Sequence, residues 1–91
     1  MKYEIIRKYV EEVIIDWDVR DEIFNGGDAV DYEVEIQSIA RFIEKHDINE
    51  LLVPALTAHI SIAFNTDTKY EEMAKNIIDT LKIIKEYVQE E

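Results

Sequence analysis

The sequence predicts an all-α protein, a small four-helix antiparallel bundle in a single helical domain over residues 1–91. Apolar residues recur at spacings of three and four along four segments, which is typical of amphipathic helices. Two glycines and one proline supply few of the turns that a β architecture needs. Apolar residues form 47% of the 91-residue chain, which is enough for one hydrophobic core.

The first helix is expected over residues 2–17. Asp16 and Asp18 place negative charge where the helix dipole disfavours it, so the helix should end at Trp17 or Asp18. We expect Trp17 in the core or at its rim, although an exposed tryptophan there would suit an interface hot spot. The apolar stripe consists of Ile6, Tyr9, Val10, Val13, Ile14 and Trp17.

An irregular loop is expected over residues 18–30. Asn25, Gly26, Gly27 and Asp28 form the clearest break in the chain, because glycine adopts positive φ angles at little cost. The flanking segments lack the alternation of a β-hairpin, so the break predicts a loop between two helices.

The second and fourth helices are expected over residues 31–46 and 69–89. Asp28 or Asp31 can cap the second helix, and Thr68 forms a capping box with Glu71 ahead of the fourth. Both segments carry a clear apolar stripe. The two stripes comprise Tyr32, Ile36, Ile39, Ala40 and Ile43, and Tyr70, Met73, Ala74, Ile77, Ile78, Leu81, Ile84 and Val88.

The third helix is expected over residues 48–64. Asp47 and Glu50 form a variant of the capping box, but Pro54 lies too deep in the segment for an undisturbed helix. The third helix should therefore be kinked, or restart with Pro54 in its first turn.

The third helix is also apolar on almost every side, and such a helix favours complete burial. Small side chains along it would let another helix approach closely. That neighbour is either a helix of the same bundle, with the third helix buried centrally, or a second copy of the chain in a homodimer. The small residues are Pro54, Thr57, Ala58 and Ser61.

Composition excludes several classes of function. The chain has no cysteine, which removes disulfides, thiolate metal sites and cysteine nucleophiles. It opens with mixed charge and not with a secretory signal. Its uncharged stretch Leu51–Phe64 is shorter than the about 20 residues of a membrane-spanning helix. We therefore expect a cytoplasmic protein with no cofactor and no membrane association.

The chain is strongly acidic, with a formal net charge of −11 from 21 acidic and 10 basic residues. Nucleic-acid binding requires clustered Lys and Arg, so this charge argues against a nucleic-acid partner. Residues 21–50 contain nine acidic and two basic side chains, a sum of −7. A region of this charge would attract a basic protein partner.

The acidic residues of the loop allow one enzymatic alternative, a small metal-dependent or carboxylate-based enzyme. Asp18, Asp21, Asp28 and Asp31 offer the oxygen ligands that hard cations prefer. The pattern lacks the turn glycine and the closing carboxylate of a calcium loop. A solvated helix end and helix caps explain most of these residues, so we expect no metal site.

The histidines and serines form no catalytic pattern. His46 is expected at the end of the second helix, and His59 is expected to be half-buried with a backbone partner. Ser38 and Ser61 lie within helices and have no histidine or lysine beside them, unlike nucleophilic serines. Neither serine stands in the Asp-Ser-Leu motif of acyl carrier proteins, another class of small acidic helical proteins.

The order of features resembles a family of short, uncharacterised bacterial helical proteins known as a domain of unknown function. In that family a first helix ends in Trp-Asp-Pro, and the next helix opens with Tyr and continues with Glu-Ile. Two more helices follow, and the last contains an Ile-Ala or Met-Ala step. The resemblance covers roughly residues 10–84, with Val19 where the family has proline. It implies an all-helical bundle with no established activity. The matching residues are Trp17-Asp18, Tyr32, Glu35-Ile36 and Met73-Ala74.

The sequence therefore predicts a non-enzymatic protein–protein interaction module that presents an acidic surface to a basic partner, in the manner of an inhibitor, an immunity protein or an adaptor. The immunity proteins of nuclease colicins are an analogy in charge alone. A homodimeric structural module built on the third helix is a further alternative. The residues expected to bind the partner are Trp17, Asp18, Asp21, Glu22, Asp28, Asp31 and Glu35.

Overall fold

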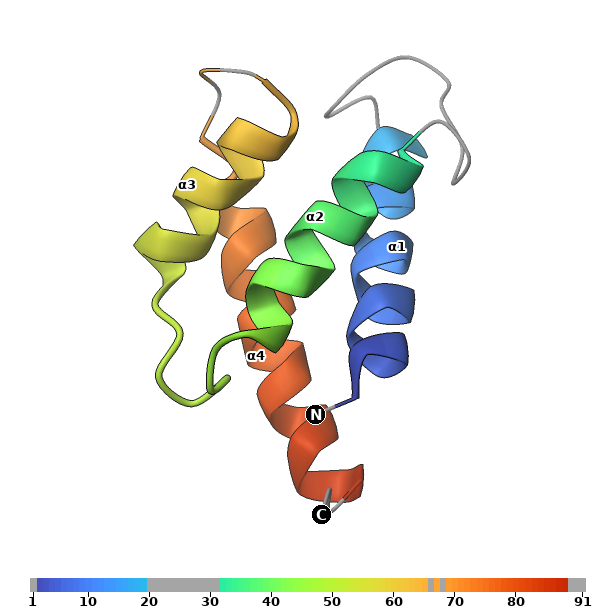
Figure 1. The fold of residues 1–91 in the computed structure, drawn as a ribbon, viewed down its shortest axis with the longest axis vertical. Coiled ribbons are helices and arrows are strands. Elements are labelled where there is room, and N and C mark those ends of the chain that lie inside the picture. The colour runs from blue at the N-terminus through green and yellow to red at the C-terminus, as the bar shows by residue number, and fades with distance from the viewer. Residues whose placement is uncertain (1, 20–31, 66, 68, 89–91) are drawn as a thin grey trace.

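The computed structural model describes residues 2–19, 32–65, 67 and 69–88. Four helices run alternately up and down (Figure 1), and no strand occurs in this part of the chain. They are α1 (Tyr3–Val19), α2 (Glu33–Glu44), α3 (Val53–Ala63) and α4 (Glu71–Val88). The predicted fold class, a small four-helix antiparallel bundle, is confirmed.

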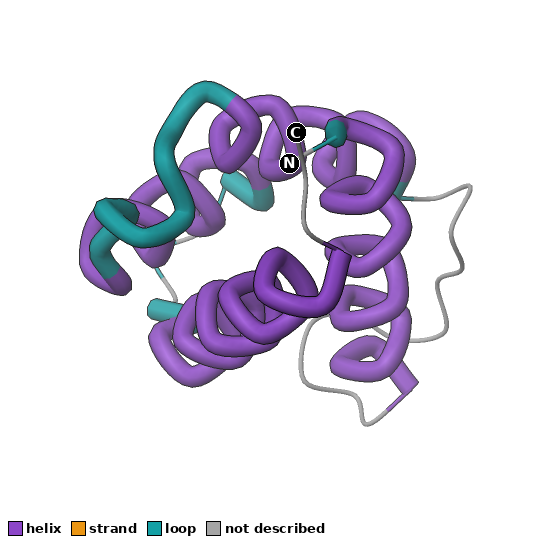
Figure 2. Tube along the Cα trace, turned by 90° about the horizontal axis from the view of Figure 1, so that it is seen from below, coloured by secondary structure: helices purple, strands orange, loops and turns teal. Residues whose placement is uncertain are grey.

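Each helix packs against two neighbours. α1 contacts α2 and α4, and α3 contacts the same two helices. Among the described residues α1 and α3 do not contact each other, so they stand at diagonal corners of the bundle. Figure 2 shows the helices from below, arranged around a common centre.

The apolar stripes predicted from the sequence meet at this centre. Their burial removes apolar surface from water, which is the main favourable term in folding. No helix in the described part of the chain has both the length and the apolar character needed to cross a membrane. The side chains of α1, α2 and α4 that are at most 2% exposed include Ile6, Val10, Ile14, Ile36, Ile39, Ile43, Met73, Ile77 and Leu81.

Four aromatic rings connect the helices at the end of the bundle where α1 ends and α2 begins. Trp17 packs edge-on against Tyr70, with 6.2 Å between ring centroids. Phe64 lies 6.1 Å from Tyr70 and 6.0 Å from Tyr32, again with inclined rings. Each of the four helices is joined to this aromatic layer at or next to one of its ends. Trp17 is only 8% exposed, so the prediction of a core or rim position is confirmed.

α3 begins later than the predicted residue 48. Leu52 is extended (φ −94°, ψ 145°), and Pro54 follows within the first helical turn. A proline at this position costs little, because the first backbone N–H groups of a helix have no partner inside the helix. The predicted restart at Pro54 is therefore correct, and the alternative of a kinked helix over residues 48–64 is wrong.

Asp47 closes a turn and does not cap a helix. Its carboxylate accepts a hydrogen bond from the backbone N–H of Asn49 at 3.0 Å. Its carbonyl accepts hydrogen bonds from the N–H groups of Glu50 and Leu51. The capping-box prediction at Asp47 was therefore wrong, because short local bonds satisfy these groups within a turn. The predicted caps Asp28, Asp31 and Thr68 lie outside the described residues.

α3 is buried on one side only. Leu56 and Ile60 are fully buried, but Ile62 is 74% exposed and Leu52, directly before the helix, is 67% exposed. The alternative in which α3 is buried centrally within the bundle is wrong, because a corner helix with two neighbours leaves its outer face uncovered. The homodimer alternative stays a prediction. The small-residue strip is divided accordingly, with Thr57 and Ser61 buried and Pro54 and Ala58 exposed.

Candidate functional site

The described part of the chain contains only three of the seven residues predicted to bind a partner. Asp18 lies in the last turn of α1, Glu35 is half-buried on α2, and Trp17 belongs to the aromatic layer. A tryptophan at 8% exposure offers little of its ring surface to a partner. The other four residues, Asp21, Glu22, Asp28 and Asp31, lie outside the described residues.

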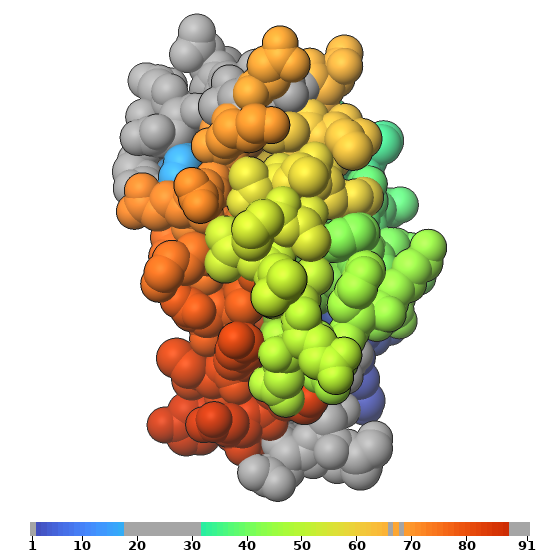
Figure 3. All heavy atoms as spheres, turned by 90° about the vertical axis from the view of Figure 1, so that its left-hand side faces the viewer, coloured from blue at the N-terminus to red at the C-terminus, as the bar shows by residue number. Residues whose placement is uncertain are grey.

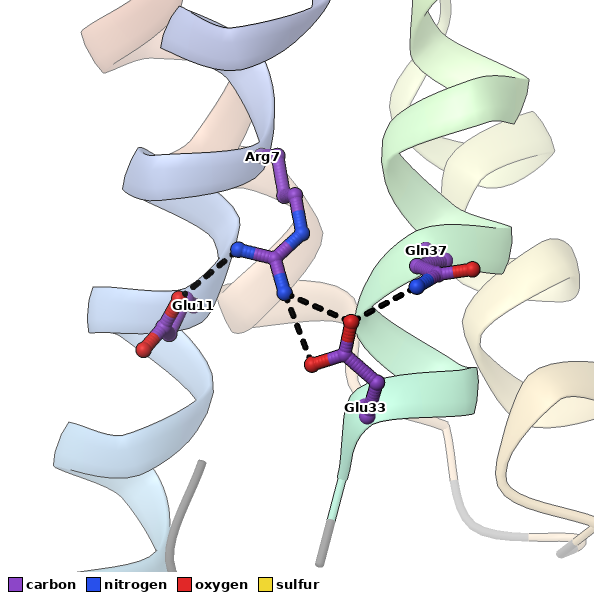
Figure 4. A network of polar contacts seen from close by, with 4 residues as sticks. All are labelled: Arg7, Glu11, Glu33 and Gln37. Carbon is purple, nitrogen blue, oxygen red and sulfur yellow. Dashed lines mark hydrogen bonds and ion pairs between the residues drawn. The ribbon is translucent and has the colours of Figure 1, made fainter. Parts of the chain in front are cut away.

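Part of the acidity of residues 21–50 is neutralised within the bundle. Arg7 on α1 donates from Nη2 to both carboxylate oxygens of Glu33, at 2.7 and 2.8 Å (Figure 4). Gln37 donates to the same carboxylate at 2.6 Å, and Arg7 also reaches Glu11 at 3.2 Å. The hydrogen bond from Arg7 holds the pKa of Glu33 below its usual value. Glu33 therefore joins α1 to the start of α2, and Arg7 balances part of its charge.

A second acidic group of residues 21–50 is also held within the protein. The hydrogen bond from the Asn49 backbone lowers the pKa of Asp47, and Lys85 on α4 lies 3.5 Å from the Asp47 carboxylate. This pair links the α2–α3 connection to α4. Exposed pairs of this kind contribute little stability, but they reduce the charge that a partner would meet.

The described residues form a different acidic site, a groove between α1 and α4 with a volume of about 340 Å³. α1 and α4 are in contact along one side of the bundle, and the groove follows their seam. We call it the α1–α4 groove. Its lining residues are Tyr9, Glu12, Val13, Asp16 and Trp17 from α1, and Asn76, Asp79 and Thr80 from α4.

The α1–α4 groove combines carboxylates with aromatic rings. Glu12, Asp16 and Asp79 are exposed, while Tyr9 and Trp17 supply half-buried and buried ring surface. A cationic side chain is attracted both by carboxylates and by the face of an aromatic ring. The volume lies near the lower end of the roughly 300–1,000 Å³ range of ligand pockets, which suits a side chain better than a large cofactor.

One cation already lies beside the groove. Lys75 donates to Asp79 at 2.9 Å, four residues apart on α4, and this hydrogen bond raises the pKa of Lys75. Both side chains are more than half exposed, so the pair is of the weak, screened kind. A cation from a partner could therefore compete for Asp79.

The carboxylates of the groove are not arranged as a metal site. Among the residues that the structure describes, no three or more His, Asp or Glu side chains lie together in a way that could hold a metal ion. The metal-dependent alternative depends on the loop acids Asp21, Asp28 and Asp31, which lie outside this part of the chain, together with Asp18.

Sequence reasoning missed the α1–α4 groove, although one signal was present. Glu12 and Asp16 are four residues apart and therefore share a face of α1. Asn76, Asp79 and Thr80 share a face of α4 for the same reason. Each set had the appearance of an ordinary solvated face, and only the packing of α1 on α4 brings the two together.

His59 joins α3 to α2. Its Nε2 atom lies 3.0 Å from Ser38 Oγ and 3.1 Å from the carbonyl oxygen of Ser38. The ring also stacks on Phe42, with 4.3 Å between centroids. The prediction of a half-buried histidine with a backbone partner is confirmed. The expectation that Ser38 has no histidine beside it is wrong, because the packing of α3 on α2 brings His59 to it. An Nε2–H that donates to a carbonyl has no lone pair to accept a proton from Ser38, so the geometry favours a structural bond over a nucleophile and base.

The surroundings of His59 predict a pH dependence of stability. Burial lowers the pKa of His59 below its usual value of 6.5. Above this value the imidazole is neutral in both the folded and the unfolded chain. As the pH falls through 6.5, the unfolded chain takes up the proton first, so stability is lost between the unfolded and the lower folded pKa.

We therefore expect the free energy of unfolding to fall between about pH 7.5 and about pH 5.5, with a slope of at most about 1.4 kcal/mol per pH unit for one linked proton. Urea unfolding at the two pH values measures it. His59→Gln should remove the fall, and His46→Gln is the matched control that should retain it. The lowered pKa values of Glu33 and Asp47 act only at lower pH, below their usual values of 4.5 and 3.8. An equal fall in the His59→Gln protein would contradict this account.

Comparisons with known proteins add no relative, since no family model, curated protein or solved structure matches the chain. The resemblance to the domain of unknown function therefore stays a prediction. Most residues that carry it are packing residues. Trp17, Tyr32, Ile36, Met73 and Ala74 are all at most 8% exposed, so they concern the fold and not an activity.

Proposed function

We propose that this protein is a non-enzymatic interaction module that binds a basic protein, and that the α1–α4 groove is the centre of the contact. The observation that carries the proposal is the grouping of Glu12, Asp16 and Asp79 around the rings of Tyr9 and Trp17. An arginine or lysine of the partner would enter the groove, with its charge at the carboxylates and its stem mainly along the half-buried ring of Tyr9.

The charge of the whole chain supports the same kind of partner. A net charge of −11 on 91 residues creates a field that attracts a basic protein and repels nucleic acid and anionic lipid. Such a field raises the association rate more than it lowers the dissociation rate.

The exposure of the groove carboxylates supports binding over catalysis. General acid–base chemistry with two carboxylates needs environments that separate their pKa values, usually by burying one of them. Glu12, Asp16 and Asp79 are all exposed. The Ser38–His59 pair is explained by the link between α2 and α3. An inhibitor, immunity or adaptor role needs only the surface.

A capture experiment tests the proposal. The protein is immobilised and exposed to lysate of the source cell at low and at high salt, and retained proteins are identified by mass spectrometry. We expect a basic protein that is retained at low salt and released at high salt, since screening weakens exposed charge pairs. The Glu12→Gln/Asp16→Asn protein should lose it.

A matched control separates the groove from the total charge. Glu50→Gln/Asp67→Asn removes the same two negative charges from exposed positions outside the groove. This protein should retain the partner nearly as well as the unmodified chain. Equal loss in both double variants would show that net charge alone is responsible, and the absence of any basic protein at low salt would contradict the proposal.

A further inference from the structure

The outer face of α3 is a second exposed surface, with a chemistry opposite to that of the groove. It carries no charged side chain over the whole of Val53–Ala63. Pro54, Ala55, Ala58 and Ile62 are exposed on it. Figure 3 views this side of the molecule, where α3, in yellow, lies at the surface between α4 and α2. We call this surface the α3 face.

The α3 face is hollowed along its border with α4. One hollow of about 280 Å³ is lined by Pro54, Thr57, Ala58, Lys69 and Glu71. A second, more open hollow of about 600 Å³ continues from Ala58 and Lys69 toward Ile62, Asn65 and the acidic Asp67. The two hollows share Ala58 and Lys69, so together they form one groove beside α3. Small side chains along a helix let the backbone of another helix come close.

We propose that the α3 face is a homodimer interface, in which α3 of one copy packs antiparallel against α3 of a second copy. Two chains of net charge −11 repel each other wherever their acidic surfaces meet. α1, α2 and α4 each carry exposed acidic residues, whereas α3 carries none. A second copy therefore meets no acidic side chain on α3 itself, and the acidic residues that border the hollows, Asp67 and Glu71, lie beside Lys69.

The hydrogen-bond state of Thr57 agrees with an incomplete surface. Thr57 is 7% exposed and lines the first hollow, and its hydroxyl has no hydrogen-bond partner among the described residues. A buried hydroxyl without a partner is unfavourable. A helix of a second copy in the hollow could bring a polar group to it after a rotation about the Thr57 side-chain bond.

The border of the α3 face is compatible with two-fold symmetry. In a two-fold dimer every contact occurs twice. If a residue of the first copy contacts a given residue of the second copy, the same two residues also meet with the copies exchanged. Lys69 and Glu71 border the same hollow, so the Lys69 of each copy can approach the Glu71 of the other. Exposed pairs of this kind add little affinity, but they favour one orientation of the helices.

The small size of the α3 face predicts a weak dimer. A helix of 11 residues is about 16 Å long, and stable interfaces bury about 800 Å² on each partner. We therefore expect a dissociation constant in the micromolar range or higher. The dimer should strengthen as salt rises, because salt screens the repulsion between the two acidic chains. Capture of a basic protein weakens with salt, so the two associations respond in opposite directions.

Sedimentation velocity tests the dimer, over about 5 to 500 µM protein and at about 50 and 500 mM salt. We expect an average mass that rises from one chain toward two, with tighter association at the higher salt. Ile62→Glu and Ala58→Glu place a charge in the α3 face at exposed positions and should each remain monomeric. Tyr87→Glu is the matched control, since Tyr87 is 84% exposed on α4, and it should associate like the unmodified chain.

Two results would overturn the proposal. One is a mass of a single chain for the unmodified protein over the whole concentration range at both salts. The other is association of the Ile62→Glu and Ala58→Glu proteins equal to that of the Tyr87→Glu protein. Circular dichroism confirms that each variant keeps its helices, so a loss of association is not mistaken for unfolding.

Discussion

Trp17→Ala is expected to lower the free energy of unfolding by about 3–5 kcal/mol, as removal of a large buried aromatic side chain usually does. Trp17 is 8% exposed and packs edge-on against Tyr70, which in turn contacts Phe64. Its removal leaves a cavity at the point where the ends of the four helices meet. Small domains have about 5–15 kcal/mol of stability in total, so the variant should lie close to unfolding. Urea unfolding followed by circular dichroism measures the change.

Tyr87→Ala is the control for this prediction. Tyr87 is also aromatic and lies in α4, but it is 84% exposed. Substitutions at exposed positions usually change stability by no more than about 0.5 kcal/mol. Similar losses in the Trp17→Ala and Tyr87→Ala proteins would contradict the view that Trp17 belongs to the core.

The second large effect is expected on affinity and not on stability. Glu12→Gln/Asp16→Asn should weaken binding of a basic partner at least tenfold. A partner that covers the groove excludes water from these carboxylates, and hydrogen bonds to charged groups are then worth roughly 1.5–3 kcal/mol each. Isothermal titration calorimetry with the captured partner measures it. The salt dependence of the affinity should also become shallower, since fewer charge pairs remain to be screened.

The control for affinity is again Glu50→Gln/Asp67→Asn, with the same change in net charge. The dissociation constant of this control protein should stay within about threefold of that of the unmodified protein. Its lower net charge weakens the long-range attraction of the basic partner, but the contacts in the groove remain. A tenfold loss in the control protein would place the contact outside the α1–α4 groove.

The fold could be predicted from the sequence because its determinants are local. The spacing of Ile6, Val10 and Ile14, and of Met73, Ile77 and Leu81, is a property of single helices, and these residues are buried where the stripes predict. The start of α3 was the weakest point. Asp47 has the pattern of a cap, and whether its hydrogen bonds form a helix or a turn depends on Pro54 seven positions later.

The site could not be predicted in the same way, because it depends on which helices are neighbours. Glu12 and Asp79 are far apart in the sequence, and they line one groove only because α1 packs on α4. For Glu33 the sequence overstated the acidic surface. Its charge was included in the sum for residues 21–50, but Arg7 on α1 donates hydrogen bonds to both of its carboxylate oxygens. Charge counts over a segment record total acidity but not which carboxylates are already paired.

The two proposed surfaces are compatible in one assembly. α1, which supplies most of the groove, stands diagonally opposite α3 in the bundle. A dimer through the α3 face would therefore leave both α1–α4 grooves open. Two grooves on one particle would raise the apparent affinity for a partner that carries repeated basic segments.

A titration of the isotope-labelled protein with a short arginine-rich peptide, followed by amide NMR shifts, tests the central proposal most directly. If the α1–α4 groove binds a basic segment, the amides of Tyr9–Trp17 and Asn76–Thr80 should shift and saturate, and fluorescence of the single tryptophan, Trp17, should change in parallel. The Glu12→Gln/Asp16→Asn protein should show neither change. Saturating shifts confined to other residues, or shifts that are the same in the double variant, would contradict the proposal.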